Sequence, residues 1–277
     1  MSIATLDGVL AGFKPPVPYA KVATPTLVAG RPHSLWYLAG SPGAGLTPAN
    51  TAGGVSLSST SALVNGQLYH QDPASGNSYL GRFAASATQP GCLMLCDRLM
   101  QVGGNSAGSA ISVTTTTAQT INTGALPSRD NTGTANGVGV QWGLEVITAT
   151  GAGTATPAIG YTNSGGTTTR TASVVDTYVA SSAIGAFYRF GLQAGDVGIK
   201  SVESLTLSVS MTSGSIALVA YRVLACLELP GGFIPNAIDA LTSGFPQEYN
   251  GVVPFLIFMP STTTATNVSG TYVETQG

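Results

Sequence analysis

Charged residues are scarce in this chain. Only 22 of its 277 residues are Asp, Glu, Lys or Arg, which is 8%, against about 25% in ordinary soluble domains. A monomer of this size exposes about 11,000 Å², so the chain carries one charge per roughly 500 Å² of surface. Protein interfaces are depleted in Lys and Glu. The scarcity therefore predicts a surface that is covered by copies of the same chain or by neighbouring proteins.

Long apolar runs and basic clusters are also missing. The longest apolar stretch, Val252–Met259, is interrupted by Pro254, and a membrane-spanning helix needs about 20 apolar residues. The net charge is −2, and Lys14, Lys21 and Lys200 are the only lysines. Without a basic stripe to follow a phosphate backbone, we expect no direct nucleic-acid partner and no membrane partner.

Cysteine is rare as well. Cys92, Cys96 and Cys226 are too few for a disulfide framework. The first residues lack the basic flank and apolar core of a signal peptide. We therefore expect folding in a reducing cytoplasm, with the three cysteines as buried thiols.

The residues that are abundant favour strands and turns. There are 36 Gly and 16 Pro, with many Thr, Ser, Ala and Val. Apolar residues alternate with polar or small ones along 138–146, which is typical of a half-buried strand. The segments with a strand pattern are 79–86, 92–99, 138–148, 155–162, 168–175, 186–192, 201–211, 216–229, 252–259 and 268–274. Their spacing predicts an all-β fold, a jelly-roll-like β-sandwich.

Three segments are expected along the chain. Residues 1–75 form an N-terminal arm with one short helix, which Ser2 caps and Gly12 ends. Residues 76–230 form the main β-sandwich, and residues 231–277 form a C-terminal β-hairpin unit that packs on the sandwich or on a neighbouring subunit. For the arm, two readings stay open: an irregular lead-in to the sandwich, or an arm that reaches over a neighbouring subunit.

Three pairs of consecutive strands are expected to be hairpins, because a short turn separates the strands of the first two pairs and the polar loop Pro260–Asn267 joins those of the third. They are 79–86 with 92–99, 201–211 with 216–229, and 252–259 with 268–274.

No catalytic residue is predicted. Gly104-Asn-Ser106-Ala-Gly108 matches the pattern of a hydrolase nucleophile elbow, but the β-branched residues after it do not favour the helix that the motif needs. His33 and His70 are the only histidines. Asp72 lies close to His70, yet Gln71–Gly76 has the composition of a turn in which Asp72 bonds to its own backbone. We expect structural histidines and no enzyme activity.

No cofactor or metal is predicted either. Cys92 and Cys96 lack zinc-knuckle spacing and have no histidine beside them. Residues 129–133 hold one carboxylate and are typical of a turn rather than of a calcium loop. Residues 40–45 lack the Gly-Lys-Ser/Thr end of a phosphate-binding loop.

Several sequence segments resemble those of a family of tailed-bacteriophage virion structural proteins. They are Ser34-Leu-Trp-Tyr-Leu-Ala-Gly40, Ser75-Gly-Asn-Ser-Tyr-Leu80, Cys96-Asp-Arg-Leu99, Thr115-Thr-Thr-Ala-Gln-Thr120, Tyr161-Thr-Asn-Ser-Gly165, Gly191-Leu-Gln-Ala-Gly-Asp196, Asn236-Ala-Ile-Asp-Ala-Leu241 and Val253-Pro-Phe-Leu-Ile-Phe258. The resemblance spans nearly the whole chain and carries no catalytic motif. It implies a virion component with a jelly-roll sandwich, assembled in the cytoplasm of a host bacterium.

The weak helix pattern argues against the major shell protein of such a particle, whose usual fold needs a long helix. We therefore expect a capsid decoration or cement protein that binds the major capsid protein and forms a homo-oligomer, a trimer. A tail or baseplate component is an alternative. A glycan-binding module is another, for which Tyr249 beside Glu248 is the only indication.

Four aromatic residues are candidates for the interface between subunits: Trp36, Tyr37, Phe255 and Phe258. For each of them, a place in the core of the chain itself is an equal alternative.

Overall fold

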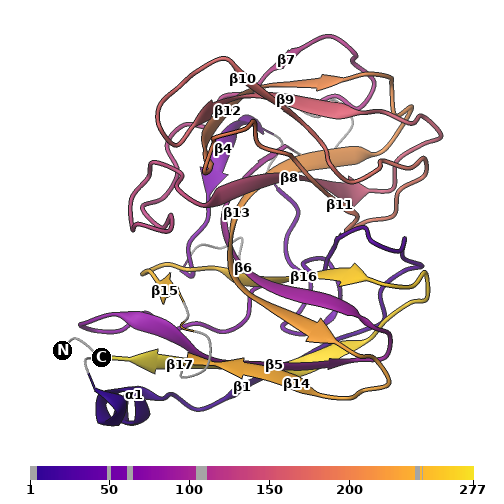
Figure 1. Cartoon of the computed structure of the whole chain (residues 1–277). Coiled ribbons are helices and arrows are strands. Elements are labelled where there is room, and N and C mark those ends of the chain that lie inside the picture. The colour runs from indigo at the N-terminus through magenta and orange to yellow at the C-terminus, as the bar shows by residue number, and fades with distance from the viewer. Residues whose placement is uncertain (1–4, 49–50, 61–64, 104–110, 241–243, 245) are drawn as a thin grey trace.

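The computed structural model describes residues 5–48, 51–60, 65–103, 111–240, 244 and 246–277. These residues form three antiparallel sheets (Figure 1). The central sheet has the order β11 (Phe187–Arg189), β8 (Val140–Thr148), β13 (Ser215–Leu229), β6 (Gly91–Gly103), β16 (Pro254–Pro260) and β2 (His33–Ser34), with β4 (Thr51–Ser56) beside β6. The cap sheet has the order β10 (Arg170–Ser173), β9 (Pro157–Asn163), β12 (Ile199–Leu207) and β7 (Gln119–Thr120). The terminal sheet has the order β14 (Asn236–Asp239), β5 (Ser78–Ala87), β17 (Val268–Gln276), β1 (Val17–Lys21) and β3 (Gly40–Ser41), with β15 (Gln247–Glu248) beside β5.

The two longest strands, β6 and β13, connect the two halves of the molecule. They pair with each other over almost their full length. In Figure 1 the cap sheet lies at the top, the terminal sheet lies at the bottom, and β6 and β13 run between them. The central sheet is therefore one layer that is shared by two sandwiches.

Three apolar clusters fill the interior. The cap core lies between the central and cap sheets and includes Trp142, Leu218 and Tyr161. The terminal core lies between the central and terminal sheets and includes Leu95 and Tyr272. The outer core is made up of Trp36, Leu57, Cys92, Met94, Cys96, Phe187, Val219, Tyr221, Val253, Phe255 and Ile257.

Alternation along β13 shows which face each core occupies. Leu218 belongs to the cap core and Val219 to the outer core, and successive side chains of a strand point to opposite faces. The register with β6 shifts twice, between Ala220 and Tyr221 and between Val223 and Ala225. These bulges keep the cap core and the terminal core on one face of the central sheet while the strands bend.

The expected strands are present, and the all-β sandwich is confirmed. All three expected hairpins are wrong. β5 joins the terminal sheet while β6 joins the central sheet, and β12 and β13 also lie in different sheets. The expected C-terminal hairpin separates in the same way, since β16 pairs with β6 and β17 pairs with β5 and β1. Each of these connections crosses from one sheet to the other, because each strand there has an apolar face that must meet the opposite sheet.

The expected short helix is α1 (Leu6–Gly12). Its N-cap is Thr5, whose hydroxyl accepts a hydrogen bond from the Gly8 amide at 3.1 Å; the predicted cap, Ser2, lies outside the described residues. β1 then pairs with β17 inside the terminal sheet, and the Tyr19 ring is buried in the terminal core. This part of the arm is thus built into the chain's own sheet, as in the lead-in reading. In the described part of the chain, no helix has the length and apolarity needed to cross a bilayer.

Candidate functional site

Half of the scarce charges are inside the protein. Eleven of the 22 charged residues are buried: Lys21, Arg31, Asp97, Arg98, Arg129, Asp130, Glu145, Asp176, Arg222, Glu248 and Glu274. Six are exposed: Asp7, Lys14, Arg82, Lys200, Glu203 and Glu228. The remaining five are partly exposed. The outer surface is consequently even poorer in charge than the composition indicates.

One group of buried charges lies between the cap core and the terminal core, and we call it the charged seam. Asp97 and Arg222 are cross-strand partners on β6 and β13. The Arg129 guanidinium donates to Asp97 Oδ2 from Nε at 3.1 Å and to Asp97 Oδ1 from Nη2 at 3.3 Å. The Val253 amide also donates to Asp97, at 3.0 Å. The carboxylate thus accepts three hydrogen bonds from two residues, and Arg222 Nη2 adds a charge 3.6 Å away, which compensates a buried charge.

A second buried ion pair lies in the outer core. Arg98 donates to Glu145 twice, at 3.1 Å and 2.6 Å, and the Tyr37 hydroxyl donates to the same carboxylate at 3.1 Å. The guanidinium lies 4.6 Å from the centre of the Trp36 ring and 5.4 Å from that of Phe255. This bidentate pair with stacked rings is geometry that arginine provides and lysine does not.

A third group, the histidine–carboxylate cluster, consists of His70, Asp72, Glu248 and Glu274. His70 lies 2.5 Å from Glu274 through Nδ1 and 2.9 Å from Asp72 through Nε2. Glu248 accepts a 2.5 Å hydrogen bond from the Tyr272 hydroxyl at one oxygen, while its other oxygen, Oε2, has no hydrogen-bond partner among the described residues. The side chain of His70 is fully buried, and Glu248 and Glu274 are buried with it.

The pKa values in this cluster are displaced. Burial and the nearby charge of Glu274 raise the pKa of Glu248 to about 8. Burial lowers the pKa of His70, but the hydrogen bonds and charges of its carboxylate neighbours outweigh that effect and raise it. Several carboxylates around one imidazole can keep a proton or exchange it for another cation.

A pocket of about 470 Å³ adjoins the cluster. Asp72 and Glu274 line it, together with the exposed Tyr69, Gln71 and the Lys14–Val17 segment. The cluster therefore has a route to solvent although its histidine is buried.

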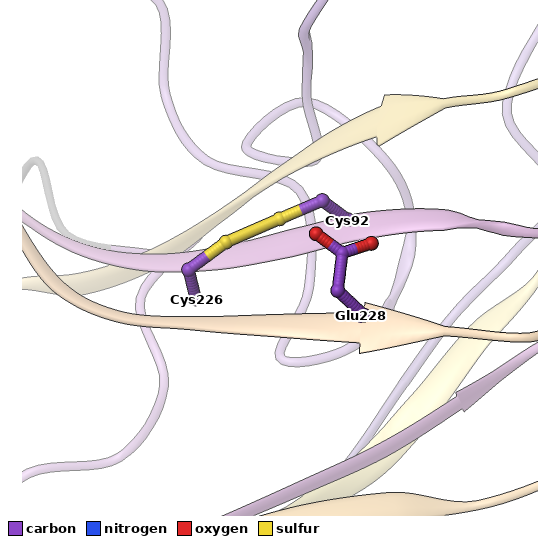
Figure 2. Close-up of side chains that lie close together, drawn as sticks. All are labelled: Cys92, Cys226 and Glu228. Carbon is purple, nitrogen blue, oxygen red and sulfur yellow. A yellow bond between two sulfur atoms is a disulfide. The ribbon is translucent and has the colours of Figure 1, made fainter. Parts of the chain in front are cut away.

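The expectation of three free thiols is wrong. Cys92 on β6 and Cys226 on β13 form a disulfide, and only Cys96 is free and buried. Figure 2 shows the bond crossing between the two strands with the carboxylate of Glu228 beside it. The pair was not visible in the sequence because 134 residues separate the two cysteines.

The structure places three of the four interface candidates inside the chain. Trp36, Phe255 and Phe258 have no exposed surface, which corresponds to the intramolecular alternative. Their rings fill the outer core and the terminal core because sheet packing needs large apolar side chains there. Tyr37 is partly exposed.

Other sequence candidates occupy varied positions. Gly104–Gly108, the pattern of a nucleophile elbow, lies outside the described residues. His33 is buried at the start of β2, and its Nε2 has no partner in the described part of the chain. Asp130 organises the predicted turn by accepting from Thr132, Thr134, Gly137 and Val138.

Two expectations about carboxylates are corrected. Asp72 does not bond to its own turn: it accepts from His70 and, at 2.8 Å, from the Gly251 amide. Glu248 is buried rather than exposed beside Tyr249, and that ring is covered by Arg222 at 5.2 Å. Tyr249 and Glu248 therefore do not form the exposed aromatic–carboxylate pair that indicated a glycan-binding site. Sequence reasoning also missed Glu274 as a partner of His70, because 204 residues separate the two.

Comparisons with known proteins do not identify a family for this chain. No protein-family model matches the chain, and no curated protein matches it. Weak structural likeness is found to the VP2 subviral particle of infectious bursal disease virus, with a TM-score of 0.20 and 10% identity over 96% of this chain and 80% of that one. T=1 particles derived from infectious bursal virus give a TM-score of 0.17 and 9% identity over 95% and 77%. At these scores the likeness carries no argument.

Proposed function

We propose that the chain is a structural protein of a tailed-bacteriophage virion, and specifically a decoration or cement protein on the capsid. The observation that carries the proposal is the outer surface. It measures 10616 Å², and only six charged residues are exposed on it, with five more partly exposed. A freely diffusing protein keeps charge on its surface for solubility, whereas interfaces exclude it.

The interior supports an architectural role rather than a catalytic one. Buried charges are engaged in ion pairs: Arg98 on β6 pairs with Glu145 on β8 of the same sheet, and Asp97 on β6 pairs with Arg129 of the segment between β7 and β8. Such pairs hold the strands and segments that they join without presenting a reactive group to solvent. In this proposal the partners are copies of the chain, as a trimer, and the major capsid protein.

Exposed apolar side chains are available for such contacts. Phe233 and Ile234 follow β13 and are each more than half exposed, as are Val175 and Val197 near the cap sheet. We propose these surfaces, with Tyr37, as parts of the subunit contacts, in place of the buried aromatic residues.

Light scattering coupled to gel filtration tests the self-association. We expect an oligomer whose mass is the same in about 0.05 M and 0.5 M NaCl, because few exposed charges are available for salt to screen. A monomer at every concentration would contradict the oligomer.

Electron cryomicroscopy of the particle that contains the chain tests the position. Density on the outer capsid surface supports the decoration role, and density in the tail or baseplate would replace it with the alternative placement. Absence from every particle would remove the proposal altogether.

A further inference from the structure

The histidine–carboxylate cluster has an unusual combination of buried groups. Four titratable side chains meet there, and one carboxylate oxygen, Oε2 of Glu248, lacks any hydrogen-bond partner among the described residues. A buried, unpartnered carboxylate oxygen is costly. It therefore points to a ligand that is not part of the chain.

The geometry fits a metal ion. One atom each from His70, Glu248 and Glu274 lies within 4.8 Å of the other two, so small side-chain adjustments bring all three to the 2.0–2.2 Å that zinc ligands keep. One imidazole with two carboxylates is a donor set suited to Zn²⁺ and similar divalent ions.

The surroundings of the imidazole fit the same assignment. Asp72 lies 2.9 Å from His70 Nε2, which leaves Nδ1 to face Glu274 and the ion. A carboxylate that holds the far nitrogen of a ligating histidine is the usual arrangement around bound zinc. Asp72 is itself held by the Gly251 amide at 2.8 Å.

We propose that His70, Glu248 and Glu274 bind one Zn²⁺ or similar divalent ion, with Asp72 orienting the histidine. The three ligands come from the segment between β4 and β5, from β15 and from β17. The ion therefore joins three segments that are distant in sequence, and it reaches them through the pocket that Asp72 and Glu274 line. Its role is to fasten the last strand of the chain to the rest of the protein.

Calorimetric titration of the full-length, chelator-treated protein with ZnCl₂ tests the site directly. We expect one Zn²⁺ per chain, and a melting temperature about 5 °C higher at a hundredfold excess over the dissociation constant. No saturable binding, or binding that leaves the melting temperature unchanged, would overturn the proposal.

Matched variants locate the ion. Glu248→Gln keeps an acceptor for Tyr272 and removes the ligand charge, so we expect affinity to fall at least about 100-fold, and Asp72→Asn should lower it about 10-fold. Glu228→Gln is the control, because Glu228 belongs to the other group in the described chain that has metal-binding geometry, beside Cys92 and Cys226. Loss of binding in Glu228→Gln but not in Glu248→Gln would place the ion there and refute the assignment.

The spectrum of bound Co²⁺ gives a readout that does not depend on variant folding. A site of one nitrogen and several oxygens gives no thiolate-to-cobalt charge-transfer band, whereas a site at Cys92 and Cys226 gives one once their disulfide is reduced, so the spectrum is recorded with and without a reductant. A thiolate band in the wild-type protein would contradict the proposal even if Glu248→Gln failed to fold.

Discussion

The cap core and the outer core lie on opposite faces of the same two strands, yet they are built differently. In the cap core, side chains such as Leu218 and Trp142 meet other apolar side chains. In the outer core, Arg98 and Glu145 lie fully buried among aromatic rings. Apolar packing tolerates changes of similar volume, whereas a buried ion pair depends on both partners. One face of these strands should therefore tolerate conservative substitutions, and the other face should not.

The sharpest test of this difference is to remove one partner of the ion pair. Arg98→Met leaves Glu145 charged and buried without its bidentate partner, and we expect the free energy of unfolding to fall by about 3–5 kcal/mol. The double variant Arg98→Met/Glu145→Leu should recover most of this loss. Urea unfolding of the three proteins gives the values. A loss below about 1 kcal/mol in the single variant would mean that the pair is not buried as described.

The apolar face should respond to volume alone. Leu218→Ala creates a cavity in the cap core and should cost about 3 kcal/mol, whereas Leu218→Met should cost less than about 1.5 kcal/mol. The matched change on the other face, Arg98→Lys, loses the bidentate geometry and should cost more than Leu218→Met. If urea unfolding gives equal losses of unfolding free energy for Leu218→Met and Arg98→Lys, the two faces do not differ in their tolerance of substitution.

A third test uses pH. Burial, together with the charge of Arg31, lowers the pKa of His33 from 6.5 to about 4. Between these two values the unfolded chain binds a proton that the folded protein does not, so stability is complete above pH 6.5 and falls as the pH is lowered. From pH 6.5 to about pH 5 the contribution lost is about 2 kcal/mol.

His33→Leu is the matched variant, since it removes this titration and no other. Chemical unfolding of both proteins at several pH values isolates His33 as the difference between their stabilities. As the pH falls from 6.5 to about 5, the wild type should lose about 2 kcal/mol of stability relative to His33→Leu. A constant difference would show that the imidazole is already charged or exposed.

The smallest effect is expected at α1, which lies outside both cores. Leu6 and Leu10 of α1 are more than half exposed, and Thr5 supplies the cap. Thr5→Ala should weaken the helix by about 1 kcal/mol or less. Hydrogen exchange should accelerate in residues 8–12 while the global unfolding midpoint stays unchanged. A shift of the global midpoint would mean that α1 belongs to the cooperative core.

The sequence was sufficient for the strands but not for their partners. Alternation along 140–146 marks a strand because side chains point to opposite faces with period two. Alternation does not show which sheet a strand joins, and a short turn such as Thr88–Pro90 can close a hairpin or cross between sheets. The crossings in this protein depend on apolar faces that meet only in the folded state.

The candidate site was hidden for a related reason. His70 and Asp72 are neighbours in sequence, which makes their contact predictable, whereas Glu248 and Glu274 reach them only because β15 and β17 both pair with β5. The interface candidates were drawn from aromatic residues, which serve cores and interfaces equally well. Composition did indicate a charge-poor exterior, and the burial of residues such as Asp97 and Glu145 makes it poorer still.

The position of β17 has a consequence for synthesis of the chain. β17 lies between β5 and β1, so the terminal sheet cannot close across that gap until Val268–Gln276 have left the ribosome. At bacterial or eukaryotic rates, translation from β1 to β17 takes on the order of tens of seconds. Throughout that interval the early strand has an open hydrogen-bonding edge, and a nascent polypeptide in this condition is a natural client for a holding chaperone.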